Sequence, residues 1–492
     1  AAGSTEYTTG VETNGTPGNS GAYTRITVAA DAPTLYYYCT NHSGMGSFVT
    51  IGANVQFNND ADPPNITITP KTDFTVGQRY ALSYPSGVFT QTGAGGSFVG
   101  TGYTFTARNY SYQLWTWGDN EFGNLGLNAP ETSRKSSPTQ IPGLTWENSL
   151  SSSSQSKHSA VAKNDGTLWT WGRNDWGQLG QNSEVNYSSP VQIPGTTWAG
   201  PTATDSEGTT YATKSDGTMW AWGRNTMGNL GQNSTNTGYS SPVQVGSDTT
   251  WPTDLGSDDG VIKLATGSDN VFAIKTDNTL WSWGTNLTGQ LGLNNTVKYS
   301  SPVQVPGSWK SIGDDGYTKF GVKTDGTAYY WGQSNDGYSG INLFEPKRSS
   351  PTQLHGGGTT WNHIAFGGTI ALAVKTDGTM WGWGENTYGQ AAIGNPDTFP
   401  QGTPGKSAPI QIGNQTNWKF VQSSASGGAS PQFAGLKTDG TLWIWGLAPF
   451  GTAGNNTVTP GSAGYSSPVQ IPGTDWKTVA LSYGKVAATK QI

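Results

Sequence analysis

"DGTLWTWGRNDWGQLG", residues 165–180, holds a two-residue turn, a short strand and a glycine-bounded loop in one run. Trp169 and Trp171 are two positions apart, so in a strand both side chains point to the same face. The preceding Asp165-Gly166 pair tolerates the positive φ angles of a type I′ turn, which joins two antiparallel strands. The stretch therefore predicts a β-hairpin that continues into a loop of fixed shape.

The same order of motifs occurs seven times, at spacings of 48 to 62 residues. In each copy a W-x-W-G strand precedes a loop, a Ser-x-Pro-x-Gln element and a lone tryptophan. Each copy fits four short strands, which predicts an all-β chain with a seven-bladed β-propeller behind N-terminal β-sandwich-like modules. The W-x-W-G strands begin at Trp115, Trp169, Trp220, Trp281, Tyr329 (a Tyr-Tyr-Trp variant), Trp381 and Trp443, and the lone tryptophans are Trp146, Trp198, Trp251, Trp309, Trp361, Trp418 and Trp476. We expect the W-x-W-G tryptophans to belong to the core.

The seven W-x-W-G strands are accompanied by only six Asp-Gly or Asp-Asn turns, so one hairpin lacks a turn of this kind. The first copy enters at Tyr110 with no strand and turn ahead of it, whereas Lys485–Lys490 matches the strand that precedes a turn. The seventh hairpin is therefore predicted to be split, with Tyr110–Gly118 paired antiparallel to Lys485–Lys490. That pairing would close the ring over residues 110–492 and remove two open sheet edges.

The recurring W-G-x-N-x-x-G-Q-L-G, S-S-P-x-Q and K-T-D-G-T-L-W motifs resemble the regulator of chromosome condensation repeat family over about residues 110–492. The resemblance implies a propeller and no single activity, because that family includes a chromatin-bound exchange factor, a plant UV-B photoreceptor and a secreted β-lactamase inhibitor. The photoreceptor's Gly-Trp-Arg-His-Thr motif is absent here, and the net charge of -6 disfavours the exchange factor. The loops 333–340 and 447–454 depart from the family pattern, so we expect them to be shaped differently.

All 21 tryptophans follow residue 110, so the preceding residues are predicted to be different modules: a partial cupredoxin-like half-domain (1–51) and a small β module or linker (52–109). Cys39, His42 and Met45 resemble the copper-ligand loop of cupredoxins, and their atoms suit copper. A type 1 site also needs a second histidine, and none precedes His42. We therefore expect no copper, and a half-domain completed by upstream residues or another chain. Phrases in this region are similar to segments of predicted marine phage and bacterial surface proteins.

Other patterns exclude several function classes. The sequence has no run of about 18 apolar residues, so we expect no membrane span. The net charge of -6 gives no basic footprint for nucleic acid. No catalytic motif is present, so we expect no enzyme activity and no cofactor. Because the chain starts at Ala1 with neither an initiator methionine nor a signal peptide, we expect a processed chain or a fragment.

One position of the repeat predicts a binding surface. Just before the glycine of each W-G-x-N-x-x-G loop stand Phe122, Trp176, Met227, Thr288, Asp336, Tyr388 and Phe450. Equivalent loops of a propeller lie on one face, where large aromatic side chains anchor carbohydrate or protein. The alternative is that these side chains pack beneath their own loops.

Taken together, these patterns favour a non-catalytic extracellular structural or adhesive protein. The expected form is a phage virion component (tail, fibre or decoration protein) on the virion surface, in a homo- or hetero-oligomer. Its partners would be other virion subunits and a host glycan or host protein receptor. A secreted bacterial binding or inhibitor protein is the alternative, and a copper-binding protein is third.

Overall fold

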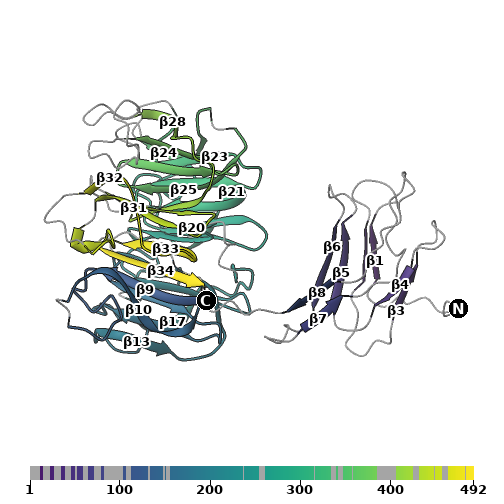
Figure 1. Ribbon diagram of the computed structural model, residues 1–492, viewed down its shortest axis with the longest axis horizontal. Helices are drawn as coiled ribbons and strands as arrows, with labels where there is room; N and C mark the ends of the chain where they lie inside the picture. Colours follow the sequence, from purple (N-terminus) through teal and green to yellow (C-terminus); the bar gives the residue numbers. More distant parts are fainter. Residues whose placement is uncertain are drawn as a thin grey trace. The chain divides into compact units, whose positions relative to one another are not determined.

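The computed structural model describes eight strands between residues 11 and 106 and most of the remaining chain. There it describes residues 112–130, 133–147, 150, 156–236, 238–253, 261–314, 316–333, 339–341, 347–356, 358–384, 406–424, 431–447, 449–456, 464–482 and 484–491. The chain divides into two compact units, Ala1–Tyr110 and Ser111–Ile492 (Figure 1).

The described residues of the first unit form four two-stranded antiparallel pairs, β1-β2, β3-β4, β5-β6 and β7-β8. Cys39, His42 and Met45 lie outside the described residues. The cupredoxin-like assignment and the division at residue 51 remain predictions. The strands are β1 Val11–Asn14, β2 Tyr23–Ile26, β3 Leu35–Tyr38, β4 Gly46–Val49, β5 Ala53–Asn58, β6 Asn65–Pro70, β7 Arg79–Leu82 and β8 Tyr103–Thr106.

The second unit is built from antiparallel sheets, which confirms the all-β prediction. Its sheets have the orders β10-β9-β34-β33, β11-β12-β13, β14 to β17, β18 to β24, β25 to β28 and β29 to β32. The strand β21 is long enough to end one repeat and begin the next, which joins two repeats in a seven-stranded sheet. A short 3₁₀ helix, η1 Pro449–Gly451, follows β31.

The strands of the first three of these sheets are β9 Tyr112–Gly118, β10 Lys135–Trp146, β33 Trp476–Ser482, β34 Lys485–Gln491, β11 His158–Ala162, β12 Leu168–Gly172, β13 Tyr187–Ile193, β14 Trp198–Thr204, β15 Thr209–Lys214, β16 Met219–Arg224 and β17 Gly238–Gln244. Those of the other sheets are β18 Leu264–Gly267, β19 Asn270–Ile274, β20 Thr279–Gly284, β21 Tyr299–Asp314, β22 Thr318–Lys323, β23 Ala328–Gln333, β24 Lys347–Gln353, β25 Trp361–Gly367, β26 Ile370–Lys375, β27 Met380–Gly384, β28 Lys406–Ile412, β29 Trp418–Ser423, β30 Gln432–Lys437, β31 Leu442–Leu447 and β32 Gly464–Gln470.

The predicted pairing of the two ends of this unit is confirmed. The first strand β9 pairs antiparallel with the last strand β34, in a register that runs from Gly118 opposite Lys485 to Tyr112 opposite Gln491. In Figure 1 the two strands lie side by side although their colours come from opposite ends of the unit. The β34 strand also pairs with β33, so both of its edges are covered.

The predicted hairpins are present, but their turn type differs from the prediction. At 163–167, Gly166 N donates to Lys163 O and Lys163 N donates to Thr167 O. Gly166 has φ +78°, whereas Asp165 is not among the residues with positive φ. A type I′ turn needs positive φ at both central residues, so this is a three-residue turn that ends in a left-handed glycine. The type I′ prediction is therefore wrong, because the Asp-Gly pair indicates left-handed backbone at only one position.

The core lies between neighbouring sheets and is rich in tryptophan. The second aromatic residue of each W-x-W-G strand is fully buried, as Trp171 and Trp222 illustrate, whereas the first, such as Trp169, is half-buried. The core prediction is thus confirmed for the second tryptophan of each strand. Each of these buried side chains stabilises the fold by about 2–3 kcal/mol. Trp171 Nε1 also donates to Asn124 O of the preceding repeat at 3.1 Å, which ties adjacent repeats together.

Candidate binding face

Two sets of connections come together at one end of the sheets of the second unit. They are the loops after the W-x-W-G strands and the turns that join the first two strands of a repeat, such as 205–208 between β14 and β15. Successive connections of an antiparallel sheet alternate between its two ends, so these two sets share one end and the Asp-Gly turns take the other. We call the first end the loop face.

A buried asparagine gives four of the described loops their shape. Asn174 Oδ1 accepts a hydrogen bond from Leu179 N at 2.8 Å, and Asn174 Nδ2 donates to Ser183 O and Val185 O. The same asparagine-to-leucine bond occurs at Asn120, Asn225 and Asn286. These bonds satisfy backbone groups that would otherwise be buried without partners. The Asn and Leu of the motif therefore hold the loop in place.

The loop glycines bring each loop against the next repeat. A Cβ on Gly123, whose φ is +71°, would lie 2.6 Å from Ser188 Cα. Asn128 N also donates to Ser188 O at 2.8 Å. Only glycine permits both this backbone conformation and this close approach. The residue before the glycine is therefore held at the junction of two repeats.

The structure ranks the predicted binding residues by exposure. Trp176 is 43% exposed, whereas Phe122, Met227, Thr288 and Phe450 are half-buried. Asp336 and Tyr388 lie outside the described residues.

The two clearest aromatic contacts are with the following repeat. Trp176 packs against Gly208, where a Cβ would lie 3.0 Å from Trp176 Cδ1, and Phe450 packs against Gly484 in the same way at 2.8 Å. Phe450 also has φ +59°, a conformation that costs a bulky residue on the order of 1–3 kcal/mol. Packing against the next repeat thus covers part of the surface of Trp176 and Phe450. Among the described residues at this position of the repeat, Trp176 keeps the largest exposed fraction.

Cations cover three of these rings. Arg224 lies 5.3 Å from the ring centroid of Trp176, and Arg134 lies 4.3 Å from that of Phe450. Phe122 has two such neighbours, Lys157 at 4.7 Å and Arg173 at 5.2 Å. A cation over an aromatic face is attracted by its quadrupole. Each cation is also in an ion pair: Arg224 with Glu207, Arg134 with Asp119, Lys157 with Glu121 and Arg173 with Asp175.

Three acidic side chains lie in the turns around Arg224, the cation that covers Trp176. Arg224 is paired with Glu207, and Asp205 and Asp269 lie in the same pair of turns. Burial, together with the charge of neighbouring carboxylates, raises the pKa of Asp205 to about 8. Burial and the charge of Glu207 raise the pKa of Asp269 to about 6. An added cation at this place would relieve the repulsion and favour the charged carboxylates.

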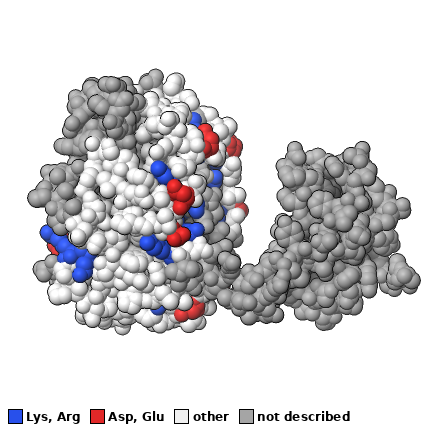
Figure 2. All heavy atoms as spheres, in the orientation of Figure 1, with Lys and Arg blue, Asp and Glu red and all other residues white. Residues whose placement is uncertain are grey.

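The motif analysis missed four exposed hydrophobic side chains in the connections of the loop face: Val185, Leu287, Val297 and Tyr317. Leu287 is 74% exposed in the loop after β20, and Tyr317 is 47% exposed in the turn between β21 and β22. Leu287 is one residue away from the predicted position, and the turn that holds Tyr317 has no recurring motif. On the side of the second unit seen in Figure 2, acidic and basic side chains lie next to each other on a mostly uncharged surface.

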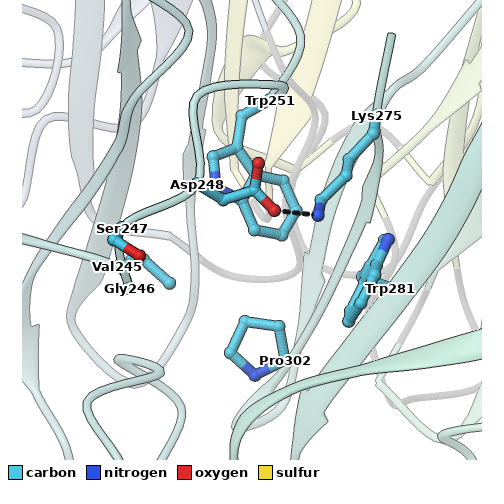
Figure 3. A pocket seen from close by; sticks show the side chains of 8 residues that line it. All are labelled: Val245, Gly246, Ser247, Asp248, Trp251, Lys275, Trp281 and Pro302. Carbon is cyan, nitrogen blue, oxygen red and sulfur yellow. Dashed lines mark hydrogen bonds and ion pairs between the residues drawn. The ribbon is translucent and has the colours of Figure 1, made fainter. Parts of the chain in front are cut away.

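A second recurring arrangement is a lysine held against two aromatic rings. Lys375, for example, lies 4.6 Å from the centroid of Trp361 and 3.8 Å from that of Trp381. We call this arrangement a lysine clamp. The lysines that form it are Lys163, Lys214, Lys275, Lys323, Lys375, Lys437 and Lys490. The Lys275 clamp opens into a pocket of about 290 Å³, where Asp248 forms an ion pair with Lys275 (Figure 3).

Within the described residues, no group of three or more His, Cys, Asp or Glu side chains could hold a metal ion. The same part of the chain has no helix with the length and apolar character of a membrane span.

Comparison with known proteins places the repeats among related domains. A family model described as RCC1-like domain matches residues 113–488. The ultraviolet-B receptor UVR8 of Arabidopsis thaliana is 27% identical over 329 residues, 63% of this chain and 68% of the receptor. Protein RCC2 of Homo sapiens is 29% identical over 31% of this chain, and the match spans 28% of RCC2. The probable E3 ubiquitin-protein ligase HERC4 of Rattus norvegicus is 29% identical over 42% of this chain, and the match spans 19% of HERC4.

Solved structures of low identity share the fold. Yeast RCC1 (Prp20) bound to Kap60 has a TM-score of 0.62 at 18% identity, covering 78% of this chain and 89% of that one. Prp20p of Saccharomyces cerevisiae, described with its binding to Gsp1p and histones, has a TM-score of 0.61 at 18% identity, covering 77% and 91%. Human WBSCR16 gives 0.61 at 18% identity, covering 78% and 99%.

These relatives overturn the function expected from the sequence. The matched proteins come from a plant and from vertebrates and are described as a receptor, RCC2 and ubiquitin ligases. The expectation of a phage virion component, with a secreted bacterial protein as the alternative, is therefore wrong. The expected virion subunits and host receptors as partners, and the expected virion-surface or extracellular location, are wrong on the same finding. The N-terminal phrases misled the prediction because they cover a small part of the chain, whereas the relatives match the propeller.

Proposed function

The chain belongs to the RCC1-like domain family, and from that premise we propose that it is a non-catalytic regulatory protein whose loop face binds a basic segment of a protein partner. The propeller has seven blades in this proposal, which the seven lysine clamps and the seven motif copies support. Residues 1–51 and 52–109 form two further β modules, and the protein acts without a cofactor.

The exposed indole of Trp176 carries the proposal. Its loop is fixed by Asn174, and its ring lies between Gly208 and Arg224, so the side chain is presented in one orientation. A rigid aromatic side chain with exposed surface is a typical hot spot of a protein interface. Few rotamers are lost when such a residue is buried, so its burial is a net gain.

The charge around Trp176 indicates a basic partner. Glu207 and Asp269 both interact with Arg224, and the pKa of Asp269 is raised to about 6 partly by Glu207. A lysine or arginine of the partner could stack on Trp176 and pair with these carboxylates. Among the similar structures, the yeast protein is described as binding both histones and Gsp1p, which supports a protein partner of this kind.

Core histones and a Gsp1p-type GTPase are the probes that test the proposal. In a titration with purified core histones, Trp176→Ala should weaken binding by at least about tenfold, because hot-spot truncation costs at least about 2 kcal/mol. The matched control is Leu144→Ala. Leu144 is 49% exposed but lies in β10, just before Trp146. Equal losses for both variants, or histone binding that W176A leaves unchanged, would contradict the assignment of the site. Binding of the GTPase alone would contradict the basic-segment assignment.

A further inference from the structure

The lysine clamps differ in whether a carboxylate forms an ion pair with the lysine. In the Lys275 clamp the ammonium lies 4.8 Å from the Trp251 centroid and 4.0 Å from that of Trp281. Asp248 reaches over the pocket and forms an ion pair with Lys275 (Figure 3). Lys275 is almost fully buried, and Asp248 supplies a counter-ion for its charge. Within the described residues, Lys275 is the one clamp lysine that forms an ion pair, and it shows one place from which a carboxylate can reach a clamp lysine.

The next clamp lacks that carboxylate. Lys323 lies 4.1 Å from the Tyr329 centroid and 5.4 Å from that of Trp309. Asp248 stands three residues before its lone tryptophan, and the same position before Trp309 is Pro306. Within the described part of the chain, Lys323 is in no ion pair and its ammonium makes no hydrogen bond. Its three N–H donors are therefore available to a ligand.

A pocket lies beside this lysine. Its volume is about 480 Å³, larger than the pocket at Lys275, and its walls include Tyr299, Tyr329, Pro306 and Pro351. Asn294 and Gln304 also line it, and both residues are exposed. One wall is fixed, because Asn295 Nδ2 donates to Tyr299 OH at 3.2 Å and to Leu293 O at 3.1 Å.

We propose that this pocket binds a carboxylate of an acidic side chain on a protein segment, which takes the place that Asp248 fills in the preceding repeat. The Lys323 ammonium pairs with the carboxylate, and the amides of Asn294 and Gln304, which line the same pocket, donate to it. The tyrosine and proline walls pack against the flanking residues of the segment. This site lies beside a lysine clamp rather than at Trp176, so it is independent of the proposed function.

Lysine-selective NMR measures occupancy of the pocket directly. The full chain, labelled with ¹³C at lysine Cε, is titrated with the capped peptide acetyl-Gly-Asp-Gly-amide and with its Asn analogue. Only the Asp peptide should shift the Lys323 signal saturably, because the Asn side chain lacks the charge. Lys275 should respond to neither peptide, since Asp248 already occupies its pocket.

Three variants sharpen the test. Lys323→Gln identifies the Lys323 signal and should weaken binding of the Asp peptide by at least about tenfold, because a charge-assisted hydrogen bond contributes about 1.5–3 kcal/mol. Asp248→Asn should make the Lys275 signal respond to the Asp peptide. Pro306→Asp should supply an internal carboxylate and abolish the response of Lys323 while that lysine is retained. Unchanged urea midpoints establish that each variant is folded.

Several results would overturn the inference. They are an unshifted Lys323 signal at tens of millimolar Asp peptide, equal shifts from the Asp and Asn peptides, and an unaltered response in the P306D variant. A response to free succinate with none to the Asp peptide would assign the pocket to a small acid and overturn the protein-segment assignment. Loss of histone binding in W176A affects none of these readouts, so the two proposals fail independently.

Discussion

At the scale of single residues, Asp205 is a buried carboxyl of the loop face whose charged form is disfavoured by its surroundings. It is buried, and its Oδ1 accepts hydrogen bonds from Thr209 N at 2.7 Å and Glu207 N at 3.1 Å. Its Oδ2 has no hydrogen-bond partner in the described residues. The pKa of about 8 means that the folded protein holds a proton there that the unfolded chain releases near pH 4. A carboxylate with this environment costs stability and is a candidate for function.

Replacement of Asp205 with asparagine should therefore change the pH dependence of stability. Between about pH 4 and pH 8 the folded wild type binds more protons than the unfolded chain, so its stability falls as pH rises. The introduced side-chain amide keeps an acceptor for Thr209 N and does not ionise. We expect Asp205→Asn to match the wild type near pH 4 and to exceed its stability at pH 8 by on the order of a few kcal/mol. Urea unfolding across this pH range measures the difference.

Asp216→Asn is the matched control for this prediction. Hydrogen bonds from Thr218 lower the pKa of Asp216, so its contribution to stability is present above its unfolded pKa and is lost as pH falls. The control variant should therefore be less stable than the wild type at neutral pH, with a difference that shrinks in acid. If the Asp205→Asn and wild-type curves are parallel from pH 4 to pH 8, Asp205 is already charged in the folded protein.

At the scale of elements, β34 is the strand on which the second unit depends most. It pairs with β9 on one edge and β33 on the other, and its Val486 and Ala488 are fully buried. Its Lys485 is also buried, and its ammonium donates to His158 O at 3.1 Å and Ser159 Oγ at 2.8 Å of the neighbouring sheet. Burial lowers the pKa of Lys485 to about 8. The strand thus joins two sheets.

Deletion of residues 485–492 should abolish the single cooperative unfolding transition of the second unit. The deletion exposes the edges of β9 and β33, and open edges promote association between chains. A chain that ends at Lys490 is the control, because six of the seven residue pairs with β9 remain. Urea unfolding and light scattering distinguish the two chains. A deleted chain that stays monomeric and unfolds like the control would show that the pairing is dispensable.

The sequence predicted the elements better than the turns and the exposed residues. Hairpins and the split closing sheet follow from local motifs and a count of turns, because turn residues and strand alternation act over short distances. The turn type was missed because an Asp-Gly pair does not reveal the φ of its aspartate. Exposure of Trp176 rather than Phe122 could not be predicted, since it depends on how many cations the next repeat places over each ring. The clamp lysines lie in a recurring motif, but their aromatic partners come from different strands.

At the scale of the whole molecule, the chain consists of two compact units with a boundary between Tyr110 and Ser111. The fold of the second unit limits the chemistry of its surfaces but does not select a partner. This explains why the motifs identified the family while the function expected from the N-terminal phrases was wrong. The repeated motifs predict the fold, whereas the partner depends on side chains such as Trp176 that differ between copies.

The fragment Ser111–Ile492 should fold by itself with the urea midpoint of the full chain. All 21 tryptophans lie between Trp115 and Trp476, so tryptophan fluorescence reports on this unit alone in both the fragment and the full chain. We expect the two unfolding free energies to agree within about 1 kcal/mol, because the tryptophan core and the closing sheet are internal to the fragment. A fragment that aggregates, or that unfolds at a clearly lower urea concentration, would show that residues 1–110 are needed.

The pairing of β9 with β34 also governs how the protein is made. About 370 residues separate Gly118 from its partner Lys485. At 5–20 residues per second, a ribosome needs roughly 20–70 seconds to synthesise that span. During this time β9 has emerged without its partner strand, and the tryptophan faces of the outermost finished repeats are open to chaperones or to other nascent chains. Translation speed and chaperone supply should therefore affect the yield of native protein more than the stability of any single repeat.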